Sequence, residues 1–281
     1  MADEAELAVD DASPAQTARN TLDYLCGKVR KASSEVLVLS LLAGGYIAFG
    51  AIVFLVVGAG GEGFSGPGHL LAGLGFSVGL ILVIVAGAEL FTGDTLLVVN
   101  RIRGTLDAGT MWRFWTLVYF ANFAGALVIA ALFVVAGGHM AGEGAVGLNA
   151  LEVGASKTGK SVVAILASGI LANMLVCLAV WAAQAARTVP GKILAVIGPI
   201  SAFVAAGFEH SVANMSLLPI ALMVKGGAGP EFWAATGVSA ADFPELTLGS
   251  AVLNLVVCTI GNTLGGASIG LAYWYAFLRK A

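Results

Sequence analysis

Four ionisable side chains lie within long apolar stretches of the sequence and are the first candidates for chemistry: Glu89, Asp94, Glu209 and His210. Charge inside a membrane is energetically expensive, so an ionisable residue there is a functional hypothesis by default. Histidine is the side chain that titrates near neutrality, and apolar surroundings favour its neutral form. His210 can therefore contact an anion and exchange a proton. It can equally be a hydrogen-bonded histidine that holds the local backbone in place, and the residues alone leave both interpretations open.

Thr92 and Lys157 add a hydroxyl and an ammonium group that can serve an anion. Thr92 follows Glu89 by three residues, and its hydroxyl can donate a hydrogen bond. Threonines in membrane helices also commonly bond their own backbone. Lys157 lies just before an apolar run and can attract anions by its charge. A lysine at a helix end also serves as an anchor at the membrane interface, with its stem along apolar surface.

Metal chemistry and nucleic-acid binding find little support in the residue pattern. Of the three cysteines, Cys26, Cys177 and Cys258, the last two lie in long apolar runs, where a small packing residue is the expected role. Two of the three histidines, His69 and His139, fall in or beside predicted loops, and no dense set of ligands at metal-site spacing is present. The basic residues form no stripe. We expect no metal, no cofactor and no nucleic-acid partner.

Composition indicates an integral membrane protein. The 281 residues are 58% apolar and only 11% charged, with a mean hydropathy of +0.92. A soluble domain carries about 25% charged residues, so this chain in water would leave too much apolar surface uncovered. The remaining interpretation is that most of the chain lies in a bilayer.

Six apolar runs are long enough to cross a hydrocarbon core of ~30 Å, which takes about 20 helical residues. They cover residues 36–60, 69–100, 111–137, 161–186, 193–224 and 246–278. We therefore predict an all-α integral membrane protein with six transmembrane helices over residues 36–281. Residues 1–35 are predicted to form a cytoplasmic N-terminal tail with an amphipathic segment.

Lysine and arginine near the helix ends predict the orientation, because cytoplasmic loops carry an excess of them. One face would hold eleven of these residues and the other three. The larger group is Arg19, Lys28, Arg30, Lys31, Arg101, Arg103, Arg113, Arg187, Lys192, Arg279 and Lys280, and the smaller is Lys157, Lys160 and Lys225. This predicts a multi-pass protein of the plasma (inner) membrane with both termini in the cytoplasm.

Two pairs of segments match each other in the same order along the chain. Residues 86–94 (AGAELFTGD) align with 206–214 (AGFEHSVAN), and residues 121–126 (ANFAGA) align with 261–266 (GNTLGG). The matches predict two repeats of three helices each. Because three is an odd number of crossings, the two repeats must be inverted relative to each other in the membrane.

Interrupted second and fifth helices are expected, since inverted repeats with broken helices are a transporter and channel architecture. A break leaves backbone groups that must be covered by protein or by a water-filled cavity. We expect breaks near residues 90–94 and 209–214, inside the protomer near the midplane, with helix N-termini turned toward an anion. Glu89 and Glu209 match in the repeats, which favours a shared structural role such as accepting backbone N–H groups.

Three segments resemble the signatures of the formate/nitrite transporter family. They are residues 89–93 (ELFTG), 207–215 (GFEHSVANM) and 169–181 (GILANMLVCLAVW). The resemblance extends from about residue 28 to the C-terminus. It implies an aquaporin-like fold of six helices, a homopentamer, and a separate substrate pathway in each protomer.

The resemblance also implies roles for individual residues. The central histidine of the family falls on His210, its threonine on Thr92, its vestibule lysine on Lys157 and the neighbouring asparagine on Asn173. The apolar constrictions fall on Phe76, Leu80, Leu90, Phe91 and Phe203.

Two further residues of the histidine segment carry over in the same way. The glutamate before the histidine is Glu209 and the asparagine of the same segment is Asn214. Asp94 stands at a position where the family varies, and it adds negative charge close to Thr92.

These residues predict a transporter of small monovalent weak-acid anions rather than an enzyme. A bare anion in an apolar constriction costs several kcal/mol, whereas a protonated carboxylic acid, with a pKa of about 4 in water, is neutral. Lys157 would gather the anion, which is protonated by His210 or by water while Thr92 and His210 hydrogen-bond it. Channel and proton-coupled carrier both fit.

Formate is the expected substrate by family, with nitrite and hydrosulfide as alternatives. A neutral-solute channel would need neither the histidine nor the lysine, and a membrane-embedded enzyme would need more ligating or catalytic residues. The tail with Lys28 and Lys31 is either a gate at the cytoplasmic mouth or a solvated segment at the membrane surface.

Overall fold

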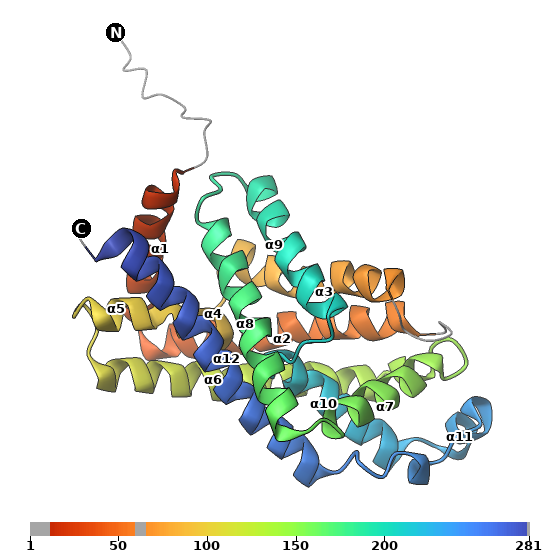
Figure 1. The fold of residues 1–281 in the computed structure, drawn as a ribbon. Coiled ribbons are helices and arrows are strands. Elements are labelled where there is room, and N and C mark those ends of the chain that lie inside the picture. The colour runs from red at the N-terminus through yellow and green to blue at the C-terminus, as the bar shows by residue number, and fades with distance from the viewer. Residues whose placement is uncertain (1–11, 60–65, 280–281) are drawn as a thin grey trace.

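The computed structural model describes residues 12–59 and 66–279, and every regular element among them is a helix (Figure 1). The α-helices are α1 (Pro14–Val29), α2 (Ser33–Gly58), α3 (Pro67–Ala86), α4 (Phe91–Asp94), α5 (Val98–Ile102), α6 (Ala108–Val135), α7 (Ala145–Thr158), α8 (Val162–Ala183), α9 (Val189–Ala205), α10 (Ser211–Gly227), α11 (Pro230–Thr236) and α12 (Leu248–Tyr273). Short 3-10 helices η1 (Thr95–Leu97), η2 (Gly138–Met140) and η3 (Ala240–Asp242) and a π-helical turn η4 (Trp274–Leu278) complete them. The first eleven residues of the predicted tail lie outside the described residues.

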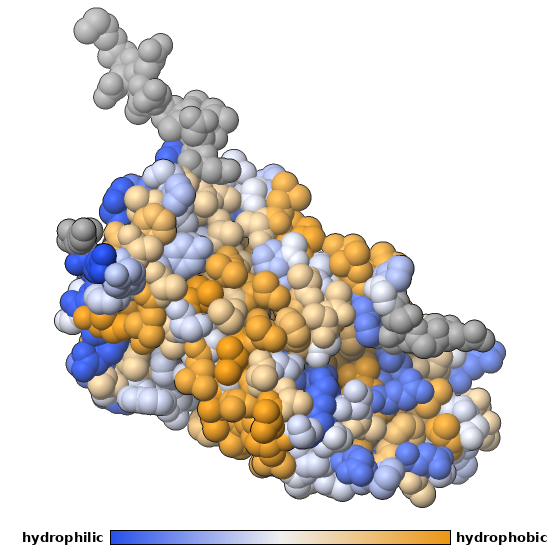
Figure 2. All heavy atoms as spheres, in the orientation of Figure 1, coloured by the Kyte–Doolittle hydropathy of each residue, from blue (hydrophilic) through white to orange (hydrophobic). Residues whose placement is uncertain are grey.

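Among the described residues, five helices are long and apolar enough to cross a membrane: α2, α3, α6, α8, and α12 with η4. Helices α10 and α11, bent by 106° relative to each other, make a sixth span if they are counted as one. Apolar side chains on the outside remain uncovered, with Phe120 63% and Val135 85% exposed. Figure 2 shows hydrophobic residues gathered over the middle of the molecule and hydrophilic residues toward its two ends. This distribution suits a bilayer as the surrounding solvent.

The two over-long apolar runs are each interrupted, as predicted. Helix α3 ends at Gly87 with a φ of 82°, and the chain becomes helical again at Phe91. Helix α9 gives way to Gly207 with a φ of 66°, and α10 begins at Ser211. Glycine takes this left-handed conformation without steric penalty and so commonly ends helices. The breaks come a few residues earlier than expected, so the polar motif residues straddle the start of the following helix.

The helices pack as two groups of three. Helix α2 packs on α3 and α6, and α8 packs on α9 and α12. In each group one glycine allows close approach: an added Cβ on Gly125 would overlap the carbonyl oxygen of Leu41, and one on Gly265 the carbonyl oxygen of Ile170. Small residues of this kind let membrane helices approach to backbone contact. The groups meet along α3 with α9, and α10, which follows α9 in the chain, packs on α6 of the first group. The opposite orientation of the two groups in a membrane stays a prediction.

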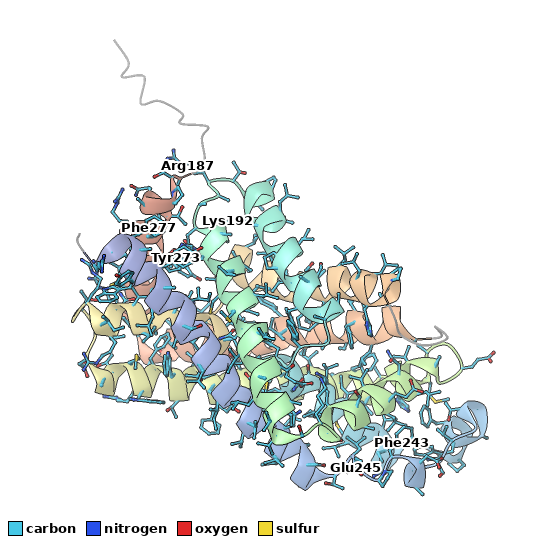
Figure 3. The ribbon with its side chains drawn as sticks, viewed as in Figure 1. Arg187, Lys192, Phe243, Glu245, Tyr273 and Phe277 are labelled. Carbon is cyan, nitrogen blue, oxygen red and sulfur yellow. The ribbon has the colours of Figure 1, made fainter. Side chains whose placement is uncertain are left out.

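The basic residues separate toward two ends of the molecule. Arg187 and Lys192 lie at the end that carries Tyr273 and Phe277, whereas Phe243 and Glu245 lie at the other (Figure 3). Helix α1 belongs to the first end, because Asn20 Nδ2 donates to the carbonyl of Gln184 at 3.2 Å. At the second end Lys225 Nζ donates to the carbonyl of Phe243 at 2.8 Å.

Replacing Gly265 by alanine should separate α8 from α12, because the new methyl group meets a backbone oxygen that cannot move alone. We expect a loss of about 1–3 kcal/mol of stability, the usual cost of overpacking, seen as a lower thermal unfolding midpoint in detergent. Gly198→Ala, an exposed helical position with nothing near its added Cβ, is the control and should leave the midpoint unchanged or slightly raised. Equal midpoints for the two variants would contradict the close packing.

Candidate functional site

His210 and Thr92 meet in the interior, where the two interrupted segments approach each other. The His210 Nε2 atom lies 3.0 Å from the Thr92 hydroxyl oxygen. Both side chains are buried. One comes from the break before α10 and the other from α4, so the pair joins residues that are 118 positions apart. The predicted central pair is therefore assembled by the fold.

The hydrogen bonds of His210 indicate its tautomer. The Ala213 N–H donates to His210 Nδ1 at 3.1 Å, so His210 caps the N-terminus of α10. In a neutral imidazole with an accepting Nδ1, the proton resides on Nε2. The Nε2–H then donates to Thr92 Oγ1, and the hydroxyl hydrogen of Thr92 is left to donate to an oxygen of a bound anion. A second proton on Nδ1 would break the helix cap.

Aromatic rings cover one side of the central pair. The Phe203 ring is stacked on His210 with centroids 5.7 Å apart, and the Phe76 ring meets Phe203 edge-on at 5.6 Å. Both rings are buried, as is Leu80. Phe76, Leu80 and Phe203, which we call the apolar collar, are thus buried apolar side chains, of which Phe203 packs directly on His210. A constriction formed by these three residues stays a prediction that the geometry accommodates.

Phe91 and Leu90 are placed differently from one another. Leu90 immediately precedes α4, has an extended backbone conformation, and its side chain is buried. The Phe91 ring packs edge-on against Tyr119 at 5.0 Å and Trp115 at 6.3 Å. It lines a cavity of about 390 Å³ between α4, α6 and α12, lined also by Trp112 and Phe120. Phe91 thus contacts the aromatic side chains of α6, a direction that the sequence did not indicate.

Glu209 gathers two lysines and an asparagine at one end of the molecule. Its carboxylate accepts from Lys157 at 3.1 Å, Lys160 at 2.6 Å and Asn214 Nδ2 at 2.7 Å. We call these four residues the Lys157 cluster. Both lysines line a cavity of about 340 Å³ that is also lined by Glu152. Side-chain donors therefore stand where backbone N–H groups were expected, and the Glu209 N–H itself donates to Ser168 Oγ.

A related cluster lies at the α1 end. Glu89 forms ion pairs with Lys28 at 2.8 Å and Lys31 at 2.5 Å, and Asp94 pairs with Lys28 at 2.6 Å. We call these four residues the Lys28 cluster. Burial alone disfavours the ammonium form of Lys28, but Asp94, together with Tyr24 and Glu89, outweighs it and raises the Lys28 pKa well above its ordinary value. Lys28 is therefore charged throughout the physiological pH range.

The lysines of the two clusters have the same spacing, which the sequence contained but did not make obvious. Lys28 and Lys31 are three residues apart and end two residues before α2. Lys157 and Lys160 are also three apart and end two residues before α8. Extending the repeat comparison to the start of each half would have identified Lys160 as a site residue. Its partner Glu209, 49 positions away, could come only from the fold.

Asn122 and Asn262 hold the two breaks in the same manner. Asn122 Oδ1 accepts from the Phe91 N–H at 2.9 Å, and its Nδ2 donates to the carbonyl of Glu89 at 2.9 Å. Asn262 Oδ1 accepts from the Ser211 N–H at 2.8 Å, and its Nδ2 donates to the carbonyl of Glu209 at 3.0 Å. Each amide bridges the backbone on both sides of a break. Both asparagines appeared in the aligned repeats, but the sequence assigned them no role.

The first turn of α10 offers fewer donors to an anion than the sequence suggested. Its N–H groups at Ser211 and Ala213 are already bonded to Asn262 and His210. Side chains thus satisfy part of the helix terminus that was expected to face the substrate. The hydroxyl of Thr92 and the imidazole remain as the central polar groups.

Asn173 acts on the backbone around Thr92. Its Nδ2 lies within hydrogen-bond distance of the Thr92 carbonyl at 3.1 Å, Thr95 Oγ1 at 3.0 Å and the Asn262 carbonyl at 2.6 Å. In the part of the chain that the structure describes, its Oδ1 is buried without a hydrogen-bond partner. Asn173 therefore anchors α4 to α12, and contact with substrate through Oδ1 stays a prediction.

Comparison with known proteins decides the family. The family profile described as Formate/nitrite transporter matches residues 15–275. The chain belongs to the formate/nitrite transporter family. It is 38% identical over 257 residues to the formate channel FocA of Escherichia coli (strain K12), with 90% of each chain covered. It is 33% identical over 242 residues to the nitrite transporter NirC of the same strain, covering 85% of this chain and 82% of that one.

Solved structures agree with this assignment. A structure described as a pentameric formate channel with formate bound matches with a TM-score of 0.84 at 36% identity, over 89% of this chain and 99% of the other. This formate/nitrite transporter family member is accordingly a multi-pass membrane transporter and not an enzyme. Among the described residues, no group of three or more histidine, cysteine, aspartate or glutamate side chains is placed to hold a metal ion.

Asn262→Ala should strand a backbone N–H and a backbone carbonyl at the second break. An unsatisfied buried group costs about 1–3 kcal/mol, so we expect a clear fall in the thermal unfolding midpoint in detergent. Thr263→Ala on the same helix is the control, because this hydroxyl bonds only to its own helix at Thr259 and the change should cost at most about 0.5 kcal/mol. A midpoint for Asn262→Ala as high as that of the control would argue against the bridging role.

Proposed function

We propose that this family member carries formate across the membrane through a route that passes the His210–Thr92 pair. One observation carries the proposal: neutral hydrogen-bond donors stand at the buried centre, beside an apolar collar, between two clusters of lysines. Lysines near the ends attract small anions by charge. Neutral donors at the centre can bind an oxygen without holding a full charge in low dielectric.

The steps follow from the positions of these groups. Lys157 and Lys160 draw the anion into the cavity beside Glu209, where charge is still partly hydrated. The anion then moves past Phe76 and Phe203 and receives hydrogen bonds from Thr92 and, after Thr92 turns, from His210 Nε2. It leaves through the Lys28 end by the reverse sequence. The order is symmetric, so the concentration gradient sets the direction.

The source of a proton is constrained by the hydrogen bonds of His210. Direct donation from an imidazolium would require Nδ1 to be protonated, and Nδ1 already accepts from the Ala213 N–H. We therefore favour water as the proton donor, with the anion becoming a stronger base as it leaves bulk solvent. The hydroxide that remains stays on the side of entry and is neutralised by a proton from bulk solvent, so one proton crosses with each anion. The acid form then passes the collar without a net charge, and His210 serves as a neutral donor.

Formate is favoured over other small anions by the relatives. FocA is named a formate channel, and one of the solved structures that match this chain is described as a formate channel with formate bound. Nitrite is the second candidate, because NirC is named a nitrite transporter and is 33% identical. Hydrosulfide shares the size and charge of both and is the third.

The assembly and orientation complete the proposal. We infer a homopentamer, because the matching structure is described as pentameric. We place the α1 end in the cytoplasm of a cell with a plasma (inner) membrane, since most basic residues gather there and cytoplasmic faces carry such an excess. The substrate pathway then runs within each protomer, and the surrounding lipid covers the apolar exterior.

Uptake into proteoliposomes tests the function directly. Formate, nitrite and hydrosulfide are offered in turn while internal pH is followed. We expect fast formate entry accompanied by proton entry. Faster entry of nitrite or hydrosulfide would change the substrate but keep the pathway, and water flux without anion flux would indicate a neutral-solute channel.

Thr92→Val removes the central hydroxyl at constant shape. The lost hydrogen bond to an anion is worth about 1.5–3 kcal/mol, so formate uptake should fall by about 10- to 100-fold. Thr116→Val is the matched control: this exposed threonine lies on α6 beside the outer cavity, and its variant should transport normally. Unchanged uptake by Thr92→Val would remove Thr92 from the pathway.

A further inference from the structure

The two lysine clusters differ at one position. Asp94 follows Glu89 by five residues, and Asn214 follows Glu209 by five residues. The Lys28 cluster therefore contains two lysines and two carboxylates, whereas the Lys157 cluster contains two lysines, one carboxylate and one amide. With all groups in their usual charge states, the first cluster is neutral and the second carries one positive charge.

The difference changes which group each lysine contacts. The Asn214 amide donates to Glu209 at 2.7 Å, so it supports the glutamate and leaves the lysines to share a single carboxylate. An aspartate has no N–H to donate. Asp94 instead accepts from Lys28 at 2.6 Å while Glu89 approaches the same ammonium group at 2.8 Å. Lys28 is thus held between two carboxylates.

The lysine side chains of the two clusters also differ in their exposure to solvent. The Lys28 side chain is 6% exposed, against 13% for Lys157 at the matching position. Both Lys157 and Lys160 line the cavity at their end, but at the other end Lys31 alone of the pair lines the cavity of about 500 Å³. A cation enclosed by two anions projects little field into solvent. Lys28 therefore attracts anions less than Lys157 does.

Most of the arginines that gather at the α1 end are exposed, so water and salt screen their charge. Glu152 lines the cavity at the Lys157 end, and Glu35 lines the cavity at the Lys31 end. Both are exposed, so water and salt screen them to a similar degree. The difference between the two ends then lies in the buried groups, where Asp94 in the Lys28 cluster corresponds to Asn214 in the Lys157 cluster.

We propose that Asp94 makes the two mouths unequal: by enclosing Lys28 it weakens anion capture at the Lys28 end, so the Lys157 end binds the anion more tightly. Asp94 is a positioning residue, since it acts through Lys28. The inference rests on the proposed anion transport. A passive route cannot favour net transport in one direction at equilibrium. Uptake from the two faces should therefore differ in both the half-saturation concentration and the maximal rate. The ratio of maximal rate to half-saturation concentration stays the same for both directions.

Sided vesicles test the proposal. Right-side-out and everted vesicles are prepared from cells that express the full chain, and initial rates of radiolabelled formate uptake are measured at equal pH on both sides. For the natural chain we expect a lower half-saturation concentration at the Lys157 face. Asp94→Asn should lower the half-saturation concentration at the Lys28 face by about 10-fold, the lower end of the range that local charge gives to anion capture.

The reciprocal variant acts as the matched control. Asn214→Asp adds the same carboxylate to the Lys157 cluster, and it should raise the half-saturation concentration in the opposite vesicle preparation. The faces are assigned by which preparation each variant changes, so the absolute orientation need not be known. The inference would be overturned if Asp94→Asn left the ratio of the half-saturation concentrations at the two faces unchanged, either because neither value changed or because both changed by the same factor.

A second readout follows Lys28 itself. Modification of lysines by a small amine reagent, read by mass spectrometry on the detergent-solubilised full chain, should be faster at Lys28 in Asp94→Asn than in the natural chain. Lys157 should react equally in both and serves as the internal reference. An unchanged rate at Lys28 would contradict the enclosure. Absent formate flux in the natural chain would instead count against the proposed function, so the two failures are distinguishable.

Discussion

The structure depends on closing two broken helices within a membrane. Backbone groups released at a break cannot bond to lipid, and each one left unpaired in hydrocarbon costs several kcal/mol. Asn122 and Asn262 meet this constraint, since one amide bridges both sides of each break. Because a primary amide both donates and accepts, a single side chain satisfies one backbone N–H and one backbone carbonyl at each break. Everything at the centre, including the position of Thr92 and His210, relies on these bridges.

Charge and neutrality are distributed along the molecule in a way that suits an anion. Ammonium groups stand at the two ends, where buried Glu89 and Glu209 balance them and make their burial tolerable. The centre holds His210 and Thr92, which are buried and hydrogen-bonded to each other. An anion is thus attracted by charge where water is near and received by neutral donors where water is excluded. A fixed positive charge at the centre would bind the anion and slow its exit.

The matching of the two halves is close but incomplete. Each half has two lysines three residues apart, a glutamate at its break and an asparagine that bonds to the backbone of that break. Asp94 and Asn214 depart from the pattern, and this single change converts an amide donor into a second anion beside Lys28. Because that pair is buried, its charge is screened little by solvent. We infer that this small difference in sequence weakens anion capture at one of the two mouths.

Local and periodic features of this protein were determined by the sequence alone. Apolar run length predicted the spans and the mid-run polar residues predicted the two interruptions. The motifs also predicted that Thr92 and His210 share one site, and the structure places them 3.0 Å apart. Such features depend on neighbours along the chain or on a repeated pattern.

Only the tertiary structure decided which distant groups meet. Lys28 forms an ion pair with Asp94, 66 positions away, and Lys160 with Glu209, 49 positions away, and the Phe91 ring packs on Tyr119. The physical reason is that a buried ion or ring takes whichever partner the helix packing brings within a few ångströms. No spacing in the sequence encodes that distance.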